Sequence, residues 1–398
     1  MTRMQTRIIR VDAVKPDDQM LLPAAEALRR GELVAFPTET VYGLGANALD
    51  PEAVARIFSA KGRPGDNPLI VHIASLEDLK PLVREITPLA EKLFRAFSPG
   101  PLTLILPKSD AVPSLVTAGL DTVAVRIPAH PVARRLIELA GVPVAAPSAN
   151  RSGRPSPTRA WHVEVDLEGR IPFIIEAGCT QFGLESTVVD ARGEVPVILR
   201  PGAITASAIR EIAGAVAGIG SSQAGASSTV LLPQELAKTP RSPGMKYRHY
   251  APKARLQIAD SIDPEMRWRQ LAGMIDKMQS GGLRVGIFVC RQALAYLPMT
   301  VDELSLDNLE RPCLAERPAG ETLSPVTAVI YGPEPDAMAA GVSLFDALRC
   351  LDQAGVRVII AEGLPERGFG SAYMNRLRKA ASHAGSDPEP GLKINGSD

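Results

Sequence analysis

The distribution of apolar residues predicts alternating helices and strands in the first half of the chain. Between residues 20 and 30 apolar side chains recur at helical spacing, Gly31 occupies the expected helix end, and the run 33–36 indicates a buried strand. Asp50 and Pro51 are typical of the start of a further helix. Further strands are expected near 69–73, 102–106, 122–127, 142–146, 172–175, 187–190 and 196–199, and helices near 87–96, 130–140 and 205–213. This alternation predicts an α/β domain with a mixed sheet.

The pattern changes after residue 213. The segment 214–229 is rich in Gly, Ala and Ser and has few large apolar residues, which predicts a linker that continues to residue 254. A second alternation follows, with strands expected at 256–259, 284–289 and 356–361 and helices at 264–278, 337–353 and 371–381. We therefore expect a large domain over 1–213, a linker over 214–254, a small α/β domain with a mostly parallel sheet over 255–384, and a polar, disordered tail over 385–398.

Composition narrows the classes of function. The 398 residues carry 44 Lys plus Arg and 44 Asp plus Glu, so no overall basic field attracts nucleic acid or an anionic membrane. Four cysteines are scattered without a CxxC pair, which argues against a disulfide framework or a structural zinc site and fits a reducing compartment. We find neither the apolar core of a signal peptide nor an uncharged apolar run of the about 18 residues that a membrane span needs. We expect a cytoplasmic protein.

The segment 37–47, PTETVYGLGAN, follows an expected strand and combines hydroxyl groups with glycines. Such residues let the backbone approach a ligand closely, but they also suit an ordinary tight connection between a strand and a helix. GLGANA within it nominally satisfies the dinucleotide pattern GxGxxG/A. The pattern is weak evidence for a dinucleotide site, because it lies six residues after its strand and no later strand ends in an acidic residue at the expected place.

Cationic residues stand beside turns or inside strands. Lys61 and Arg63 in KGRP suit phosphate or carboxylate binding, although a solvated basic helix end is the more ordinary interpretation. Arg126 lies within an apolar strand and therefore requires a carboxylate, from the protein or from a ligand. Arg200 follows a strand, and the segment 145–158 either binds phosphate or sugar through its polar groups or forms a polar loop. The chain has no Walker, GxSxG, HExxH or kinase motif, so an ATP site would be an unusual one.

Seven motifs occur in an order that resembles one known family. They are PTETVYGLG, KGRP with PLIVH, SPGPLTLIL, VAVRIP, PSAN, ESTVVD and LRPG. The set is similar to the YrdC-like threonylcarbamoyl-AMP synthase family, and SPGMKYRHYAPKA at 242–254 resembles the linker of its long two-domain form. The resemblance covers residues 12–255 strongly. It implies an α/β fold with a YrdC-like twisted mixed sheet around a large cavity, plus a smaller Rossmann-like α/β C-terminal domain.

The resemblance also implies site residues, assigned motif by motif. The catalytic set comprises Lys61, Arg63, Ser148 and Asn150. The residues that match ATP-binding positions are Arg63, Asn67, Thr122, Ser148, Ser156, Arg200 and Tyr250. The residues that match L-threonine-binding positions are Thr40, His72, Arg126, Ala146 and Ser186.

The reaction implied by the resemblance converts L-threonine, bicarbonate and ATP into L-threonylcarbamoyladenylate and pyrophosphate, a nucleotidyltransferase activity. It requires neutralisation and alignment of anionic substrates, with Mg²⁺ carried by ATP, and neither a covalent nucleophile nor a metal site on the protein. The product would pass to a tRNA threonylcarbamoyl transferase complex for threonylcarbamoyladenosine modification, with weak tRNA contact. Two other hypotheses stay open: an RNA-binding module without catalysis and a nicotinamide-dependent oxidoreductase.

The segment 242–252, SPGMKYRHYAP, is richer in cationic and aromatic residues than the run before it. A plain tether does not need these groups. We therefore expect the segment to fold over the cavity as a lid, with Tyr250 on the nucleotide and water excluded from a hydrolysable product. A basic tether on the surface is the alternative. In this interpretation the linker, rather than the second domain, completes the active site.

Overall fold

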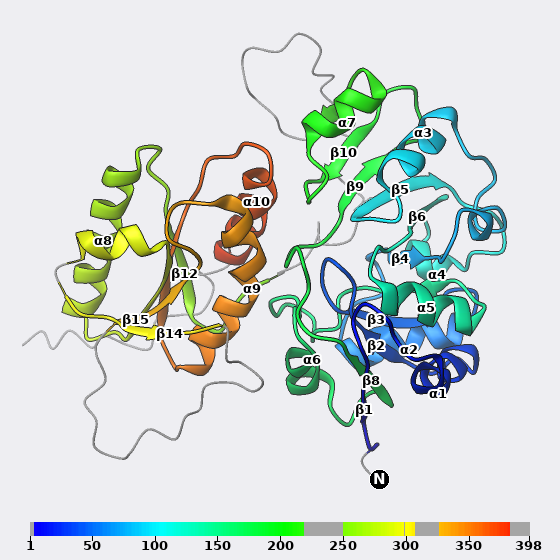
Figure 1. The fold of residues 1–398 in the computed structure, drawn as a ribbon, viewed down its shortest axis with the longest axis horizontal. Coiled ribbons are helices and arrows are strands. Elements are labelled where there is room, and N and C mark those ends of the chain that lie inside the picture. Colours follow the sequence, from blue (N-terminus) through cyan, green and yellow to red (C-terminus); the bar gives the residue numbers. More distant parts are fainter. Residues whose placement is uncertain (1–3, 219–249, 298, 307–325, 383–398) are drawn as a thin grey trace, which may run out of the picture.

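Two β-sheets organise the chain in the computed structural model, which describes residues 4–218, 250–297, 299–306 and 326–382 (Figure 1). The first sheet belongs to the N-terminal domain, residues 4–218, and has the strand order β1-β8-β2-β3-β7-β4-β6-β5-β9-β10-β11. The second belongs to the C-terminal domain, residues 255–382, and has the order β12-β16-β13-β15-β14. Most of the expected linker, 219–249, and the expected tail, 385–398, lie outside the described residues.

The N-terminal domain is built on a mixed sheet, as the sequence predicted. Its strands are β1 (Arg7–Arg10), β2 (Val34–Phe36), β3 (Gly43–Asn47), β4 (Ile70–His72), β5 (Leu102–Pro107), β6 (Thr122–Arg126), β7 (Val144–Ala145), β8 (Phe173–Glu176), β9 (Thr187–Asp190), β10 (Val197–Arg200) and β11 (Ala217–Gly218). Its helices are α1 (Asp18–Arg29), α2 (Pro51–Lys61), η1 (Glu77–Leu79), α3 (Pro88–Phe97), α4 (Ser114–Thr117), α5 (Pro131–Ala140), α6 (Ala160–Leu167) and α7 (Ala206–Ala213). The sheet contains both parallel pairs, such as β4 with β6, and antiparallel pairs, such as β5 with β6.

Local signals determine where α2 begins and ends, and this positions the KGRP motif. The carboxylate of Asp50 accepts the backbone N–H groups of Glu52 and Ala53 at the start of the helix. At its end, Gly62 adopts the left-handed conformation with φ of 61°. Lys61 therefore lies in the last turn of α2, and the chain reverses before it enters β4.

The end of the segment 37–47 forms a strand, β3 (Gly43–Asn47), where the sequence suggested either a loop that approaches a ligand or a tight connection to a helix. It pairs antiparallel with β2 and β7. Its glycines allow close packing, because a Cβ added at Gly45 would lie 2.7 Å from Cε1 of Phe36 and 2.8 Å from Cγ1 of Val144. A buried strand cannot act as the phosphate-binding turn at a helix start. The geometry therefore removes the basis of the nicotinamide hypothesis.

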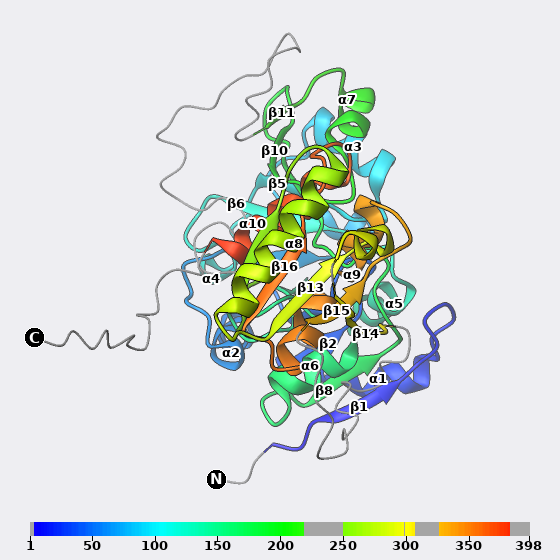
Figure 2. The ribbon, with the colours of Figure 1, turned by 90° about the vertical axis from the view of Figure 1, so that its left-hand side faces the viewer.

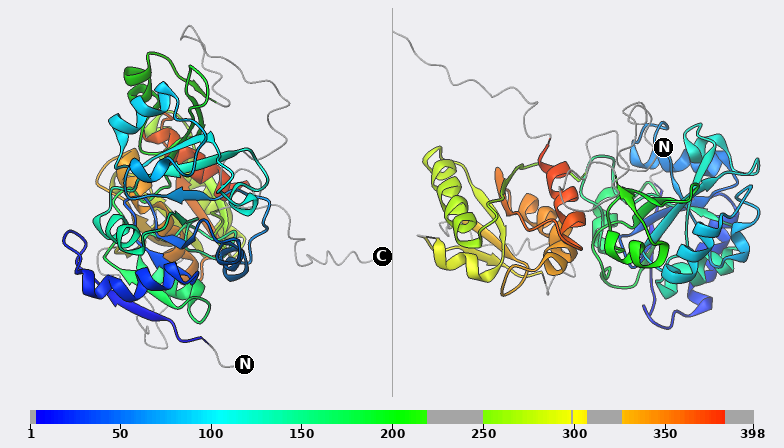
Figure 3. Two further views of the ribbon diagram at one scale, coloured as in Figure 1. Left: turned by 90° about the vertical axis from the view of Figure 1, so that its right-hand side faces the viewer. Right: turned by 90° about the horizontal axis from the view of Figure 1, so that it is seen from above.

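The C-terminal domain has a parallel sheet with helices on both faces, as expected. Its strands are β12 (Arg255–Ala259), β13 (Val285–Val289), β14 (Asp302–Leu304), β15 (Val326–Ile330) and β16 (Val358–Glu362), and its helices are α8 (Pro264–Ser280), η3 (Arg291–Tyr296), α9 (Ala337–Gln353) and α10 (Gly370–Ala381). Each pair of neighbouring strands is parallel. Figure 2 views this sheet from the side of α8. Helices α9 and α10 lie on the opposite side, between the sheet and the N-terminal domain (Figure 3, right).

The sequence pattern predicted amphipathic helices well and missed other elements. Helix α9 has the expected bounds, 337–353. Strands β1, β14 and β15 and helix α6 were not expected. Helix α6 carries buried residues around most of its circumference, including His162 and Asp166, so it has no apolar stripe to detect. Among the described residues, no helix is both long and apolar enough to cross a membrane.

Candidate active site

A pocket in the N-terminal domain gathers residues from motifs that are far apart in the sequence. Its lining comprises Thr38, Thr40, Val41, Gly43, Arg63, Ile70, His72, Arg126, Ala146, Pro147, Ser148, Glu185, Ser186, Arg200 and Tyr250. All the residues assigned to threonine are among them, as are four of those assigned to ATP. The lining does not include Lys61, Asn67, Thr122, Asn150 or Ser156.

Arg126, the last residue of β6, supplies a buried cation to the pocket. Its Nη2 lies 2.7 Å from Oε1 of Glu39, and its Nη1 donates to the hydroxyl of Thr40 at 2.9 Å. Burial acts to raise the pKa of Glu39, but the charge of Arg126 and the surrounding hydrogen bonds outweigh it and lower that pKa. Glu39 is thus the protein carboxylate that a charged residue in an apolar strand requires. Sequence reasoning missed it, although the acid lies within the PTET motif.

Arg200 and Ser186 form another part of the lining. Arg200 donates from Nε to the carbonyl of Ser186 and from Nη2 to its hydroxyl, each at 3.0 Å. The same hydroxyl lies 2.7 Å from Oγ1 of Thr103. Burial lowers the pKa of Arg200 to about 10, so the guanidinium remains charged at neutral pH. The pocket therefore holds a fixed positive charge where β9 and β10 meet.

Glu185, next to Ser186, was not among the predicted site residues. Its Oε1 accepts from the hydroxyl of Ser156, and its Oε2 accepts from Nε of Arg376 on α10 at 2.8 Å. Burial acts to raise the pKa of Glu185, but Arg376 and Arg200 lower it to about 2. The carboxylate is therefore ionised and has a partner on each oxygen. Because Arg376 belongs to the C-terminal domain, that domain contacts a residue of the pocket lining, and the expectation that the linker completes the site stays a prediction.

Lys61 lies behind the pocket and holds the PSAN loop. Its ammonium group donates to the carbonyls of Ser148 and Asn150, the latter at 2.6 Å. The hydroxyl of Ser148 donates in turn to Oδ1 of Asn150. Burial lowers the pKa of Lys61 well below its ordinary value, and the charge of Arg63 adds to this effect. Only 2% of Lys61 is exposed, so a solvated basic helix end is excluded.

Three residues predicted to contact the nucleotide, Asn67, Thr122 and Ser156, are not part of the lining. Ser156 is fully buried, and its hydroxyl donates to Glu185. Thr122 is half-buried at the start of β6. Asn67 is buried, and its side-chain amide has no hydrogen-bond partner among the described residues. Its donor and acceptor are therefore available to a ligand that reaches them.

Tyr250 is the described linker residue that lines the pocket. Its ring stacks on Phe345 of α9, with the centroids 5.1 Å apart. Its φ of 66° lies in the left-handed region, where a tyrosine is strained by about 1–3 kcal/mol and persists only if its surroundings determine it. Residues 242–249 of the expected lid, which covers 242–252, lie outside the described residues.

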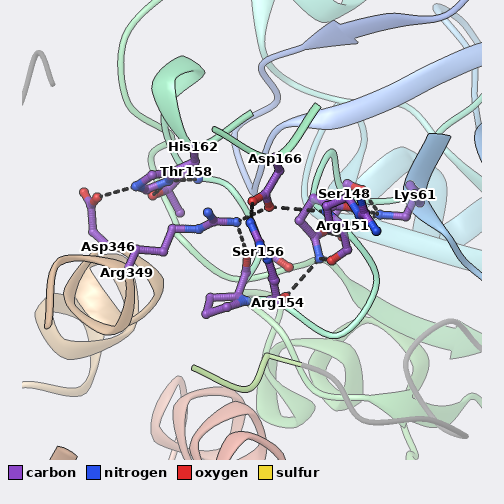
Figure 4. A network of polar contacts seen from close by, with 12 residues as sticks. Lys61, Ser148, Arg151, Arg154, Ser156, Thr158, His162, Asp166, Asp346 and Arg349 are labelled. Atoms are coloured by element: carbon purple, nitrogen blue, oxygen red, sulfur yellow. Dashed lines mark hydrogen bonds and ion pairs between the residues drawn. The ribbon is translucent and has the colours of Figure 1, made fainter. Parts of the chain in front are cut away.

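A polar network joins the C-terminal domain to the PSAN loop (Figure 4). Oδ2 of Asp166, on α6, accepts from Nη2 of Arg349 on α9 at 2.8 Å and from the backbone N–H of Arg151 at 3.3 Å. Oδ1 of Asp166 pairs with Arg154, whose carbonyl accepts from Nδ2 of Asn150 at 2.9 Å. The network therefore runs from α9 to the residues around Lys61.

The electrostatic character of the pocket favours small anions over a polynucleotide. The exposed fractions of Lys61, Arg126 and Arg200 are 2%, 3% and 4%, so these cations cannot follow a phosphate backbone along the surface. Burial lowers the pKa of His72 to about 3, and Arg126 adds to the shift. His72 is therefore a neutral hydrogen-bonding group at neutral pH. This arrangement disfavours the RNA-binding hypothesis.

Known proteins match both domains. Residues 26–202 match a family described as telomere recombination, the Sua5, YciO and YrdC group, and residues 204–382 match the threonylcarbamoyl-AMP synthase C-terminal domain. The threonylcarbamoyl-AMP synthase of Pyrococcus abyssi is 46% identical over 367 residues, which are 90% of this chain and 93% of that relative. The Bacillus subtilis protein of the same name is 45% identical over 371 residues, which are 93% and 95% of the two chains.

A solved structure extends the similarity to three dimensions. The crystal structure of P. abyssi Sua5 complexed with L-threonine is 43% identical to the chain, with a TM-score of 0.78. The match covers 95% of this chain and 98% of that one, so it spans both sheets. The motifs, the fold and these matches agree, and the chain belongs to the YrdC-like threonylcarbamoyl-AMP synthase family in its long two-domain form.

Proposed function

We propose that this chain is an ATP-dependent enzyme that forms threonylcarbamoyl-AMP and pyrophosphate from L-threonine, bicarbonate and ATP. The observation that carries the proposal is the convergence of Arg63, Arg126, Arg200 and Tyr250 on one pocket. Three cations suit a site that must hold an amino-acid carboxylate, a carbamate and a triphosphate together. The relatives named threonylcarbamoyl-AMP synthase, and the related structure that contains L-threonine, support the assignment.

Threonine is assigned to the part of the pocket around Arg126. The guanidinium of Arg126, held by Glu39 and Thr40, offers a charged donor for the carboxylate of the amino acid. The neutral ring of His72 and the hydroxyl of Ser186 offer hydrogen bonds to the amine and the hydroxyl group. Several polar groups that hydrogen-bond to one small substrate would give specificity for threonine over amino acids without a hydroxyl group.

The chemistry then requires alignment more than covalent catalysis. The threonine amine combines with bicarbonate to give a carbamate and water. A carbamate oxygen forms a bond to the α-phosphorus of ATP while the bond to the pyrophosphate oxygen breaks. Arg63 and Arg200 would neutralise the meeting anions, and Lys61 would keep the carbonyls of the PSAN loop in place.

Mg²⁺ is proposed to enter as part of the nucleotide substrate. In the part of the chain that the structure describes, no three His, Cys, Asp or Glu side chains gather as a metal site. Both oxygens of Glu185, the carboxylate in the pocket lining, already have protein partners. The triphosphate itself is a sufficient ligand for Mg²⁺, which prefers to keep several waters.

The role of the product in tRNA modification is also proposed from the family to which the chain belongs. The enzyme is assigned to the nucleotidyltransferases, and its product would serve a cytoplasmic tRNA threonylcarbamoyl transferase complex that makes threonylcarbamoyladenosine. Contact with tRNA would be weak, because the chain has no net positive charge.

One assay tests the activity directly. Pyrophosphate release by the purified chain should require threonine and bicarbonate together with Mg²⁺ and ATP. Incorporation of labelled bicarbonate, measured with each of the twenty amino acids in turn, should be greatest with threonine. Pyrophosphate release that is independent of the amino acid, or no release at all, would reject the proposal.

A further inference from the structure

Arg376 of α10 is a buried cation that no sequence motif singled out. It is 0% exposed and one of the largest fully buried side chains among the described residues. Its Nε donates to Oε2 of Glu185 at 2.8 Å, and its Nη2 donates to the carbonyl of Glu185 at 3.2 Å. Its Nη1 donates to the carbonyl of Pro201 at 2.8 Å. One guanidinium thus bridges two separate segments of the N-terminal domain.

Both segments carry residues of the pocket. Glu185 lines the pocket and precedes Ser186, and Pro201 directly follows Arg200. The guanidinium carbon of Arg376 also lies 5.9 Å from the ring centroid of Tyr250. Arg376 therefore contacts the side of the pocket that is formed by the start of β9, the end of β10 and the linker.

Holding the two domains together does not by itself require this arginine. A Cβ added at Gly183 would lie 2.3 Å from the carbonyl oxygen of Val342, so the backbones of the two domains touch there. Leu184 also packs against Gly341 in the same interface. Burying a charged pair gains little stability over an apolar contact, but it demands a defined geometry. The arginine is therefore suited to orienting the groups that it bridges.

We propose that Arg376 is a positioning residue through which the C-terminal domain orders the nucleotide side of the active site. The inference rests on the proposed function. Arg376 holds Glu185 and Pro201, and through them the neighbouring Ser186 and Arg200. It has no contact with Arg126 or Thr40 among the described hydrogen bonds and ion pairs. Of the residues assigned to threonine, Ser186 alone adjoins a residue that Arg376 holds, so the loss of Arg376 should affect threonine binding much less than nucleotide binding.

The test compares Arg376→Met and Arg376→Lys with the full-length wild-type enzyme. In Arg376→Met the KM for ATP should rise about tenfold or more and the KM for threonine should rise much less, because Arg200 and Tyr250 belong to the nucleotide side and only the neighbouring Ser186 belongs to the threonine side. Arg376→Lys should show a smaller rise, since an ammonium group can pair with Glu185 but cannot bridge to Pro201 as well. General destabilisation would lower the active fraction and leave both KM values unchanged.

Two matched controls isolate the effect. Arg378→Gln removes an exposed arginine two positions further along α10, whose partner, Glu366, lies in the same domain. Asp346→Asn weakens a different set of contacts between the domains, those of Asp346 with Arg159 and His162, which do not border the pocket. Both controls should keep the wild-type KM for ATP. If the KM for ATP rose as much in Asp346→Asn as in Arg376→Met, the inference would be overturned. Weaker docking of the two domains would then explain the effect without a specific role for Arg376.

Direct binding separates this inference from the proposed function. The Kd of a non-hydrolysable ATP analogue with Mg²⁺ should rise about tenfold in Arg376→Met. If the wild type binds the analogue but releases no pyrophosphate with threonine and bicarbonate, the proposed function fails, and the Kd comparison still decides the role of Arg376. If the wild type is active and neither the KM nor the Kd for the nucleotide changes in whichever Arg376 variant folds, the inference is wrong.

Discussion

Protonation of His162 is expected to destabilise the fold where the two domains meet. The imidazole is buried on α6. Its Nδ1 accepts the backbone N–H of Thr158 at 3.0 Å, and its Nε2 lies 2.9 Å from Oδ1 of Asp346 on α9. These contacts define a neutral ring with its proton on Nε2. A second proton on Nδ1 would break the bond to Thr158 and add a positive charge close to Arg159 and Arg349.

The size of the effect follows from the pKa of His162. Burial, the largest cause, lowers this pKa from 6.5 to about 4, although Asp346 partly opposes the shift. Between these two values the unfolded chain binds more protons than the folded one, so the free energy of unfolding falls as the pH falls. From these two pKa values, protonation of His162 alone should lower the free energy of unfolding by about 1.3 kcal/mol between about pH 7.5 and 5.5. The decrease should reach about 2.5 kcal/mol by about pH 4.5.

Urea denaturation of the wild type and of His162→Asn across this pH range measures the effect. The asparagine keeps an acceptor close to Thr158 and cannot titrate. His72 and His130, whose pKa values are also lowered by burial, act equally in both proteins and cancel in the difference. The stability advantage of the wild type over the variant should shrink by about 1.3 kcal/mol from about pH 7.5 to 5.5. A difference that does not vary with pH would refute the reasoning.

Three further variants probe other parts of the site. Lys61→Ala and Arg63→Ala should each lower turnover by about a hundredfold or more, since the first frees the PSAN loop and the second removes a cation from the pocket. Near-native pyrophosphate release in both variants would show that the site is misassigned. Arg126→Met should raise the KM for threonine far more than that for ATP, and equal rises would argue against its role at the threonine carboxylate. Arg349→Met should lower the free energy of unfolding by about 2 kcal/mol, measured by denaturation, because Asp166 stays buried with one fewer partner.

Most of the pocket could be assigned from the sequence because its groups belong to contiguous motifs beside strands. Arg126 stood out as a charge in an apolar strand, and the structure supplies the carboxylate that it required in Glu39. Helices α2 and α9 were predicted because caps and apolar stripes are local signals that do not depend on the rest of the fold. Helix α6 escaped detection because it is buried on most sides.

The sequence by itself therefore determined the succession of helices and strands, the division into two sheets, the family and most of the pocket lining. Only the tertiary structure decided that β3 is a strand, that Lys61 lies outside the pocket lining, and that Arg376 of the C-terminal domain contacts Glu185 of that lining. Glu185 and Arg376 are 191 residues apart in the sequence, and no local pattern connects them. Their pairing depends on how two separately folded domains dock. Periodicity and capping report the environment within a few residues, whereas a buried ion pair is determined by which surfaces meet.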